Sequence, residues 1–184
     1  MSLAPYQPYL DWIETQQPAM VKLVQAWAGI NSGSYHLAGL AAMRQALVQA
    51  FKPLGAEIET LPLEPITQIN SRGEKVSVPM AAALRLTKRP EAPVQVLLVA
   101  HMDTVYGVDH PFQAAKMLSD GVMNGPGVAD LKGGIVVMLH ALLALEQSPF
   151  ASQIGWQILF NPDEEIGSIS SDPILKQSVS GKHV

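Results

Sequence analysis

The first third of the chain carries apolar residues at the spacing of amphipathic helices. Apolar side chains recur three or four positions apart over residues 6–29, and Pro18 lies inside this stretch. Because proline lacks an amide hydrogen and clashes with the preceding turn, the pattern predicts two short helices or one kinked helix. A second apolar stripe over residues 37–51 predicts another helix, with Ser32-Gly33-Ser34 before it as a break and a cap.

Further along the chain, the spacing of apolar residues changes to that of β-strands. Residues 56–61 alternate between apolar and polar side chains, and residues 81–86 form another short strand-like run. The stretch 66–79 between them is mostly polar, and we expect only a turn at 71–74 there. Residues 94–100 are nearly all apolar and rich in β-branched side chains, which predicts a strand buried on both faces of a sheet.

The last third predicts a hairpin turn, an apolar helix, a strand and a short final helix. Ser119-Asp120-Gly121 is typical of the turn, residues 133–145 of the helix and residues 154–160 of a buried strand. Asp172-Pro173 predicts the start of the final helix, with Asp172 as its N-cap. This order of elements predicts an α/β fold, a three-layer αβα sandwich with a mostly parallel mixed sheet. Because another strand would normally follow, we expect the sheet to be truncated.

Composition and charge narrow the classes of protein. The chain has 184 residues, a formal net charge of −4 and no basic block, so we expect no nucleic-acid partner. It has no cysteine, and any metal site must therefore use histidine, aspartate and glutamate. We find neither a signal peptide nor a run of about 18 apolar residues. We therefore expect a cytoplasmic protein without a membrane partner.

Candidate catalytic and metal-binding residues follow the two apolar strands in the sequence. They lie at the carboxyl ends of the strands, where α/β sheets bind ligands. His101 and Asp103 come directly after the first strand, and Glu164 and Glu165 after the second. Because His101 and Asp103 are two residues apart, the carboxylate can bind one imidazole nitrogen and leave the other for a metal. Asp130 lies between the strands in sequence, and its two oxygens can bridge two cations. One of the adjacent glutamates can then bind a metal while the other serves as a general base.

The stretch "GPGVADLKGG" at residues 125–134 has an alternative interpretation, a phosphate-binding loop. The dinucleotide fingerprint requires a third glycine where Asp130 stands, and this carboxylate would repel a pyrophosphate. No Gly-Lys-Ser/Thr sequence occurs either. A nucleotide site is therefore disfavoured. The glycines instead let the backbone turn sharply around Asp130.

Three stretches together resemble the two-zinc exopeptidases and aminoacylases, a family that includes glutamate carboxypeptidase, acetylornithine deacetylase and succinyl-diaminopimelate desuccinylase. They are "HMDTV" at 101–105, "GPGVADLKGG" at 125–134 and "FNPDEEIGS" at 160–168. Taken alone, a His-x-Asp or a Glu-Glu pair is usually a solvated surface feature, but the order of the three motifs is specific. The resemblance is clear over about residues 90–170, and the sequences of the motifs are most similar to those of the glutamate carboxypeptidase branch.

This resemblance implies a metal-dependent hydrolase, a metallopeptidase or deacetylase-type amidohydrolase. Its substrate would be a small peptide that loses its C-terminal amino acid, with glutamate among the candidates, or an N-acyl amino acid. His101 would bind one Zn²⁺, Asp130 would bridge two, and Glu165 would bind the second, with Co²⁺ or Mn²⁺ as substitutes. Asp103 would position His101, and Glu164 would be the general base for a water bridging the ions. The peptide bond after Asp130 would be cis.

Members of this family are longer than the present chain. Residues 1–184 would be the N-terminal portion of the catalytic domain, without the lid/dimerisation domain and the C-terminal part of the catalytic domain. We therefore expect the chain alone to be inactive and its parent to be a homodimer through the lid domain. The alternative is a non-catalytic binding protein that retains the fold. The intact candidate residues argue against it, since a decayed enzyme would be free to lose some of them.

Overall fold

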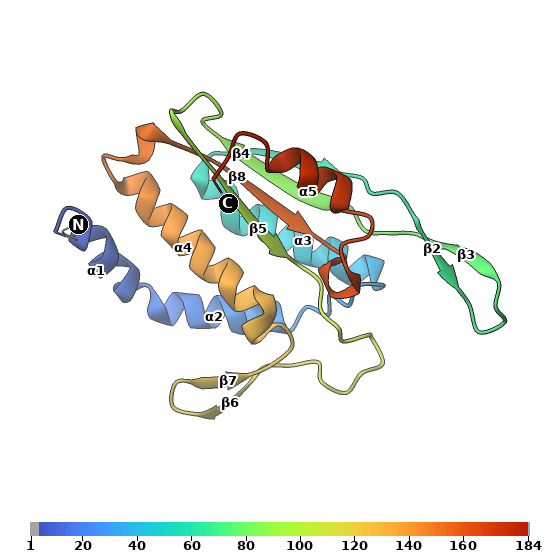
Figure 1. Cartoon of the computed structure of the whole chain (residues 1–184). Coiled ribbons are helices and arrows are strands. Elements are labelled where there is room, and N and C mark those ends of the chain that lie inside the picture. The colour runs from blue at the N-terminus through green and yellow to red at the C-terminus, as the bar shows by residue number, and fades with distance from the viewer. Residues whose placement is uncertain (1–3, 184) are drawn as a thin grey trace.

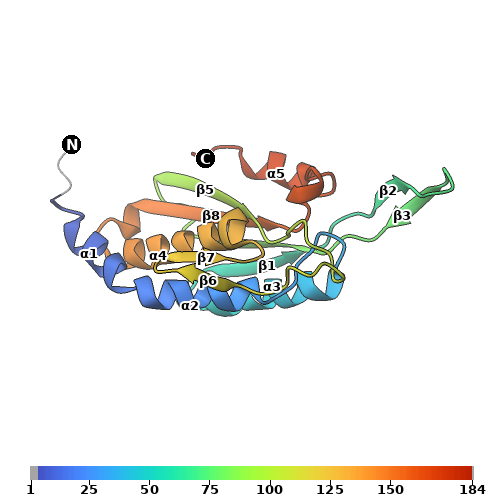
Figure 2. The same ribbon diagram turned by 90° about the horizontal axis from the view of Figure 1, so that it is seen from below.

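The computed structural model describes residues 4–183. At its centre is a mixed four-stranded sheet with helices on both faces (Figures 1 and 2). The strands lie in the order β1 (Glu57–Leu61), β4 (Ala83–Lys88), β8 (Ile154–Asn161) and β5 (Val94–His101). The α/β sandwich predicted from the sequence is therefore confirmed.

The sheet is less parallel than predicted. β8 pairs with β5 in parallel, whereas β4 is antiparallel to both of its neighbours, β8 and β1. Burial also differs between the two apolar strands. Residues 155–161 of β8 are all buried, but β5 lies at the edge of the sheet and leaves Val94 and Val99 about 40% exposed. The prediction of burial on both faces thus fits β8 and is wrong for β5.

The N-terminal helices follow the predicted pattern. α1 (Gln7–Thr15) and α2 (Gln17–Ala28) are separate helices, and Pro18 lies in the first turn of α2, where a missing amide hydrogen costs no helical bond. α3 (Leu37–Phe51) has the predicted bounds, but no side chain caps its N-terminus. The cap predicted at Ser32-Gly33-Ser34 is wrong, because the Ser34 hydroxyl is bonded to Asp103 instead.

Two hairpins extend from the sandwich. β6 (Lys116–Ser119) and β7 (Val122–Asn124) pair around the predicted turn, with Gly121 at a φ of +72°. β2 (Ile66–Ile69) and β3 (Lys75–Val78) form a second hairpin that projects away from the body (Figure 1). These two strands were not predicted because half of their residues are polar and, within the two strands, Ile66 alone is buried, so they show no regular core-facing pattern.

Helix α4 (Gly133–Gln147) packs against the sheet and against α1 and α2. The core around it is formed by buried residues that include Trp27, Leu40, Phe51, Leu86, Ile135, Leu139, Trp156, Ile158 and Phe160. The stretch Val128–Gln147 is long and apolar enough to cross a membrane by length and composition. The expectation that no run reaches this length is therefore wrong. The core helix of a soluble protein meets the same criterion, and α4 buries six residues here.

The turn between β4 and β5 is tied to helix α4 by ion pairs. Lys88 and Arg89 form ion pairs with Glu146 of α4, with N···O distances of 3.1 and 2.6 Å. The indole nitrogen of Trp156 donates to the same carboxylate at 2.9 Å. Glu146 therefore joins the end of α4 to the sheet.

The final helix α5 (Asp172–Ser178) covers the opposite face of the sheet from α1 to α4 (Figure 2). Asp172 is its first helical residue, and the N-cap is Ser171, one residue earlier than predicted. After the helix, His183 pairs with the free edge of β5. Its carbonyl accepts from the Leu97 amide at 2.7 Å, and its amide donates to the Gln95 carbonyl at 2.9 Å.

Candidate metal centre

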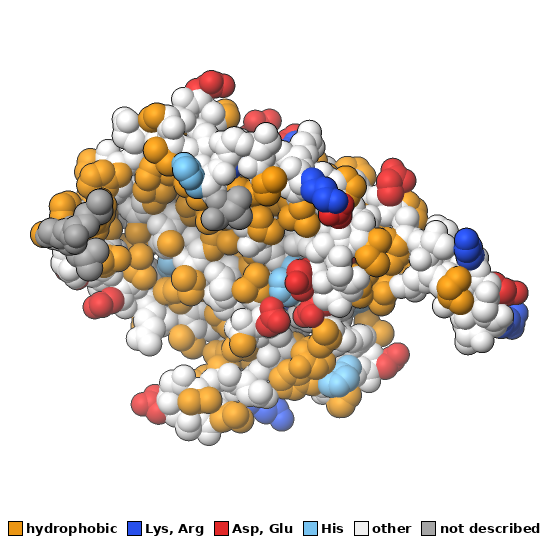
Figure 3. Space-filling model, viewed as in Figure 1, with side chains coloured by type: hydrophobic (Ala, Val, Ile, Leu, Met, Phe, Trp, Pro, Cys, Tyr) orange, Lys and Arg blue, Asp and Glu red, His pale blue; other side chains and the backbone are white. Residues whose placement is uncertain are grey.

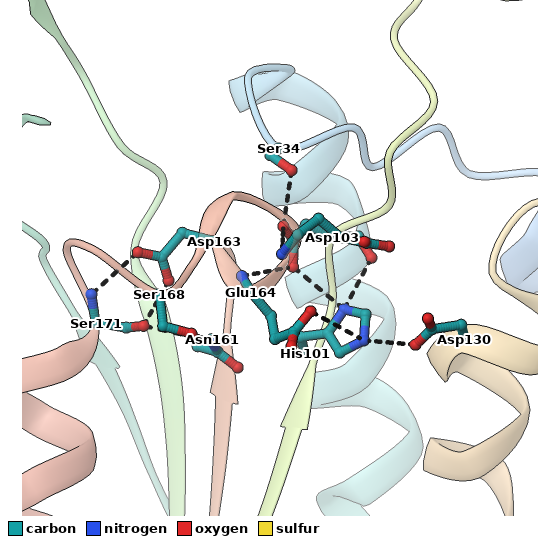
Figure 4. A network of polar contacts seen from close by, with 10 residues as sticks. Ser34, His101, Asp103, Asp130, Asn161, Asp163, Glu164, Ser168 and Ser171 are labelled. Carbon is teal, nitrogen blue, oxygen red and sulfur yellow. Dashed lines mark hydrogen bonds and ion pairs between the residues drawn. The ribbon is translucent and has the colours of Figure 1, made fainter. Parts of the chain in front are cut away.

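Three of the predicted side chains converge at the carboxyl ends of β5 and β8. One ligand atom each of His101, Asp130 and Glu165 lies within 4.8 Å of the others. His101 Nε2 is 2.9 Å from Asp130 Oδ1 (Figure 4). One imidazole nitrogen and two carboxylates are a donor set that suits zinc. The residues present therefore fit a metal site of the kind the sequence predicts.

Asp103 lies behind His101, as predicted. Its carboxylate Oδ1 is 3.3 Å and its backbone carbonyl oxygen 3.1 Å from His101 Nδ1, the ring nitrogen that faces away from Asp130. The same carboxylate accepts the Ser34 hydroxyl at 2.7 Å and the backbone amides of Glu164 and Glu165 at 3.2 and 3.1 Å. Both His101 and Asp103 are buried. Asp103 thus fixes the imidazole and, at the same time, the loop that carries the glutamates.

Glu164 and Glu165 diverge, as expected for adjacent residues. Glu165 is half-buried among the candidate ligands, whereas the Glu164 side chain is 53% exposed. Glu164 Oε2 lies 4.0 Å from His101 Nε2. Glu164 is therefore near the candidate ligands and open to solvent. Acidic side chains gather beside a histidine near the middle of this face (Figure 3).

Several carboxylates lie close together in the cluster, and they shift the pKa values of His101 and Glu165. Burial disfavours the protonated imidazole, but the hydrogen bonds with Asp103 and Asp130 and the charge of Glu164 outweigh it and raise the pKa of His101 to about 9. Burial and the carboxylates of Asp130, Asp103 and Glu164 raise the pKa of Glu165, against the opposing effect of His101. Protons and a metal ion would therefore compete for the same atoms.

Asp130 occupies a break in the chain just before α4. Its φ of −130° and ψ of 96° are not helical, and they interrupt the short turn Val128–Lys132. The peptide bond between Asp130 and Leu131 is cis, as the resemblance implies. A Cβ on Gly133 would lie 2.3 Å from the Val128 carbonyl oxygen, so only glycine fits this close approach. The Asp130 side chain remains 75% exposed and faces His101.

Lys132 anchors this loop from the inside, a role that the sequence did not reveal. Its side chain is buried, and Nζ donates to the carbonyls of Trp27 at 3.1 Å and Ile30 at 2.8 Å. Burial lowers the pKa of Lys132 to about 8. The loop bearing Asp130 is thereby held to the C-terminal end of α2. The partners are more than 100 residues away in sequence, so no local signal could identify them.

The loop that carries the glutamates is held by a network of serines (Figure 4). Asp163 is fully buried and accepts the backbone amides of Ser170 and Ser171 at 2.8 and 3.1 Å. Asn161 donates to the hydroxyls of Ser168 and Ser171 at 3.2 and 3.3 Å. The Asp163 carboxylate therefore caps the turn that follows Glu164 and Glu165. The serines look like an ordinary polar loop in the sequence.

Comparisons with known proteins agree with this geometry. Residues 97–183 match the family model of peptidase family M20/M25/M40. Carboxypeptidase G2 from Pseudomonas sp. (strain RS-16) is 30% identical over 162 residues, which cover 88% of this chain and 36% of that protein. Human carnosine dipeptidase 1 superposes with a TM-score of 0.76 at 17% identity, over 97% of this chain and 38% of that one. The dipeptidase Dug1p from Saccharomyces cerevisiae superposes with a TM-score of 0.74 at 16% identity, over 96% of this chain and 38% of that one.

Residues 97–183 therefore match part of a domain of peptidase family M20/M25/M40, and the chain is homologous to carboxypeptidase G2. The solved structures, at their low identities, support the fold. His101, Asp130 and Glu165 all lie within the matched residues. The resemblance drawn from the three motifs is confirmed. The chain spans only about a third of the length of these relatives.

Proposed function

We propose that this chain belongs to a metal-dependent hydrolase that cleaves an amide bond in a small peptide or an N-acyl amino acid. The observation that carries the proposal is the approach of His101, Asp130 and Glu165 to within 4.8 Å of one another. Glu164 lies beside them with a solvent-accessible carboxylate. The homology to carboxypeptidase G2 supports a carboxypeptidase more than a deacetylase.

His101 and Glu165 would each hold one of two Zn²⁺ ions, and Asp130 would bridge them. The mixed nitrogen and oxygen donors support this assignment. Bound zinc would polarise the scissile carbonyl and make a water molecule at the site more acidic. Asp103 keeps Nδ1 of His101 engaged, so that Nε2 faces the site.

Glu164 is the general base of this proposal. It takes a proton from the attacking water as the water oxygen bonds to the carbonyl carbon. It then gives a proton to the amide nitrogen as the carbon–nitrogen bond breaks. Its exposed carboxylate, 4.0 Å from His101 Nε2, supports this role because it can reach both the water and the leaving group.

Residues 1–184 would form the N-terminal portion of the catalytic domain. The chain spans 36% of carboxypeptidase G2, which supports the idea that a longer protein supplies further metal ligands and groups for the substrate carboxylate. A lid domain in that protein would also form a homodimer. The isolated chain would then have little or no activity.

Substituting Glu164→Gln in the protein at its full natural length tests the proposal. We expect the rate of amide hydrolysis to fall by about 10²–10⁴-fold with the zinc content unchanged, because only proton transfer is lost. Glu91→Gln, an exposed glutamate in the turn before β5, is the matched control and should leave the rate unchanged. No hydrolysis in the unaltered protein would favour a non-catalytic binding protein, whereas a hydrolysis rate that Glu164→Gln does not lower would show that Glu164 is not the general base.

A further inference from the structure

A cavity of about 510 Å³ opens beside the candidate metal centre. Its walls come from residues 33–36 before α3, from the loop after β5 at 104–110, and from Glu165 and Ile166. Glu165 belongs to both the cavity and the cluster of candidate ligands. A molecule held at the centre can therefore extend a side chain into the cavity. Its volume is in the range of small-ligand pockets.

The walls of this cavity are mainly apolar. Tyr35, Val105 and Val108 contribute side chains that are 52%, 65% and 55% exposed, although each is large and hydrophobic. Exposed apolar side chains that surround a hollow beside a reactive centre are typical of a binding pocket. Ile166 adds a further apolar side chain next to Glu165.

The charged groups of the walls are all acidic. Asp109 and Glu165 line the cavity, and among the described residues around it there is no lysine or arginine. Two histidines, His36 and His110, also line it, and each has Nδ1 engaged with a backbone group at 3.1 Å. An acidic ligand group would therefore lose its water and face the Asp109 carboxylate without a lysine or arginine partner among these wall residues.

The cavity is held open by contacts between its two longest walls. The Thr104 amide donates to the Ser32 carbonyl at 3.0 Å, and the Ser34 amide donates to the Thr104 carbonyl at 3.3 Å. A Cβ on Gly33 would come within 2.5 Å of the Tyr106 carbonyl oxygen, so the two segments pack as closely as glycine allows. Asn31 Nδ2 donates to the Tyr106 carbonyl at 3.2 Å. The walls are therefore built before any ligand binds.

We propose that this cavity is the subsite for the substrate side chain next to the scissile amide, and that it accepts an uncharged apolar side chain and rejects an acidic one. This inference rests on the proposed hydrolase function and narrows its substrate class. It departs from the glutamate substrate that the resemblance allows. An apolar side chain gains from burial against the valines, whereas glutamate would be repelled by Asp109, the acidic wall residue outside the cluster of candidate ligands.

Binding of matched dipeptides tests the subsite. The Glu164→Gln protein, supplied with zinc, is titrated with two series of dipeptides, which it should bind without hydrolysing. One series is Leu-Ala, Gln-Ala and Glu-Ala, and the other is the reversed series Ala-Leu, Ala-Gln and Ala-Glu. Methyl resonances of Val105, Val108 and Ile166 report the contact by NMR. In one of the two series, we expect the leucine-containing dipeptide to bind at least tenfold more tightly than the glutamate-containing one and to shift these methyl signals. Equal or tighter binding of glutamate in both series, no leucine binding at millimolar concentration, or unshifted methyl signals would overturn the inference.

A charge placed in the wall provides the second test. Val108→Arg should shift the preference at least tenfold toward glutamate, because it supplies the missing cation. Val137→Arg is the matched control, since Val137 is 59% exposed on α4 and does not line the cavity. Equal effects of both variants, or none from Val108→Arg, would overturn the subsite. Turnover that depends on Glu164 but favours glutamate would overturn the subsite alone, whereas no amide hydrolysis in the unaltered protein would overturn the hydrolase function.

Discussion

Asp103 Oδ1 lies 3.3 Å from His101 Nδ1. Asp103 is the residue at which the two halves of the candidate site meet. The imidazole belongs to the end of β5, while the amides of Glu164 and Glu165 that bind the same carboxylate belong to the loop after β8. A single buried carboxylate therefore sets the position of the histidine relative to both glutamates.

Asp103→Asn should weaken zinc binding by about 10–100-fold, because the substituted side chain no longer supplies a charged acceptor behind the imidazole. Titration with zinc in the presence of a competing chelator measures the change. Ser34→Ala is the graded comparison, since it removes one donor to Asp103 and leaves its charge in place. It should weaken binding less than Asp103→Asn. Unchanged zinc affinity in Asp103→Asn would show that the carboxylate does not support the site.

Lys132→Met should lower the free energy of unfolding by about 1–3 kcal/mol, since the buried carbonyl of Trp27 and the partly buried carbonyl of Ile30 lose their donor. Chemical denaturation measures this difference. Lys22→Met, on the exposed side of α2, is the matched control and should change stability by less than about 0.5 kcal/mol. Equal stabilities of the two variants would mean that the buried ammonium does not anchor the loop.

Acid should weaken the contact between α4 and the sheet. Burial opposes ionisation of Glu146, but hydrogen bonds from Arg89, Trp156 and Lys88 lower its pKa from the ordinary 4.5 to about 2. Because the folded pKa lies below the unfolded one, this stabilisation is complete above pH 4.5 and is lost as the pH falls toward 2. The free energy of unfolding, measured from pH 6 to pH 2, should therefore fall less steeply in Glu146→Gln than in the unaltered chain. Parallel pH profiles of the two proteins would contradict this assignment.

The sequence predicts those parts of the structure whose signals are local. The apolar stripe of α3 gives its bounds, and Ser119-Asp120-Gly121 gives the turn of a hairpin. The candidate ligands could be identified because each follows or precedes a strongly apolar element. The antiparallel placement of β4 could not be predicted, because strand direction depends on the path of the polar hairpin before it. The partners of Ser34 and Lys132 are likewise set only by the folded chain, across 69 and more than 100 residues.

Zinc content per chain tests the central claim most directly. The protein at its full natural length is compared with Asp130→Ala and with Asp109→Asn, an aspartate that lines the neighbouring cavity outside the cluster of candidate ligands. We expect about two zinc ions in the unaltered protein and in Asp109→Asn, and about one or none in Asp130→Ala, because the bridging carboxylate is lost. No zinc in the unaltered protein, or the same content after Asp130→Ala, would contradict a bridged metal centre at these residues.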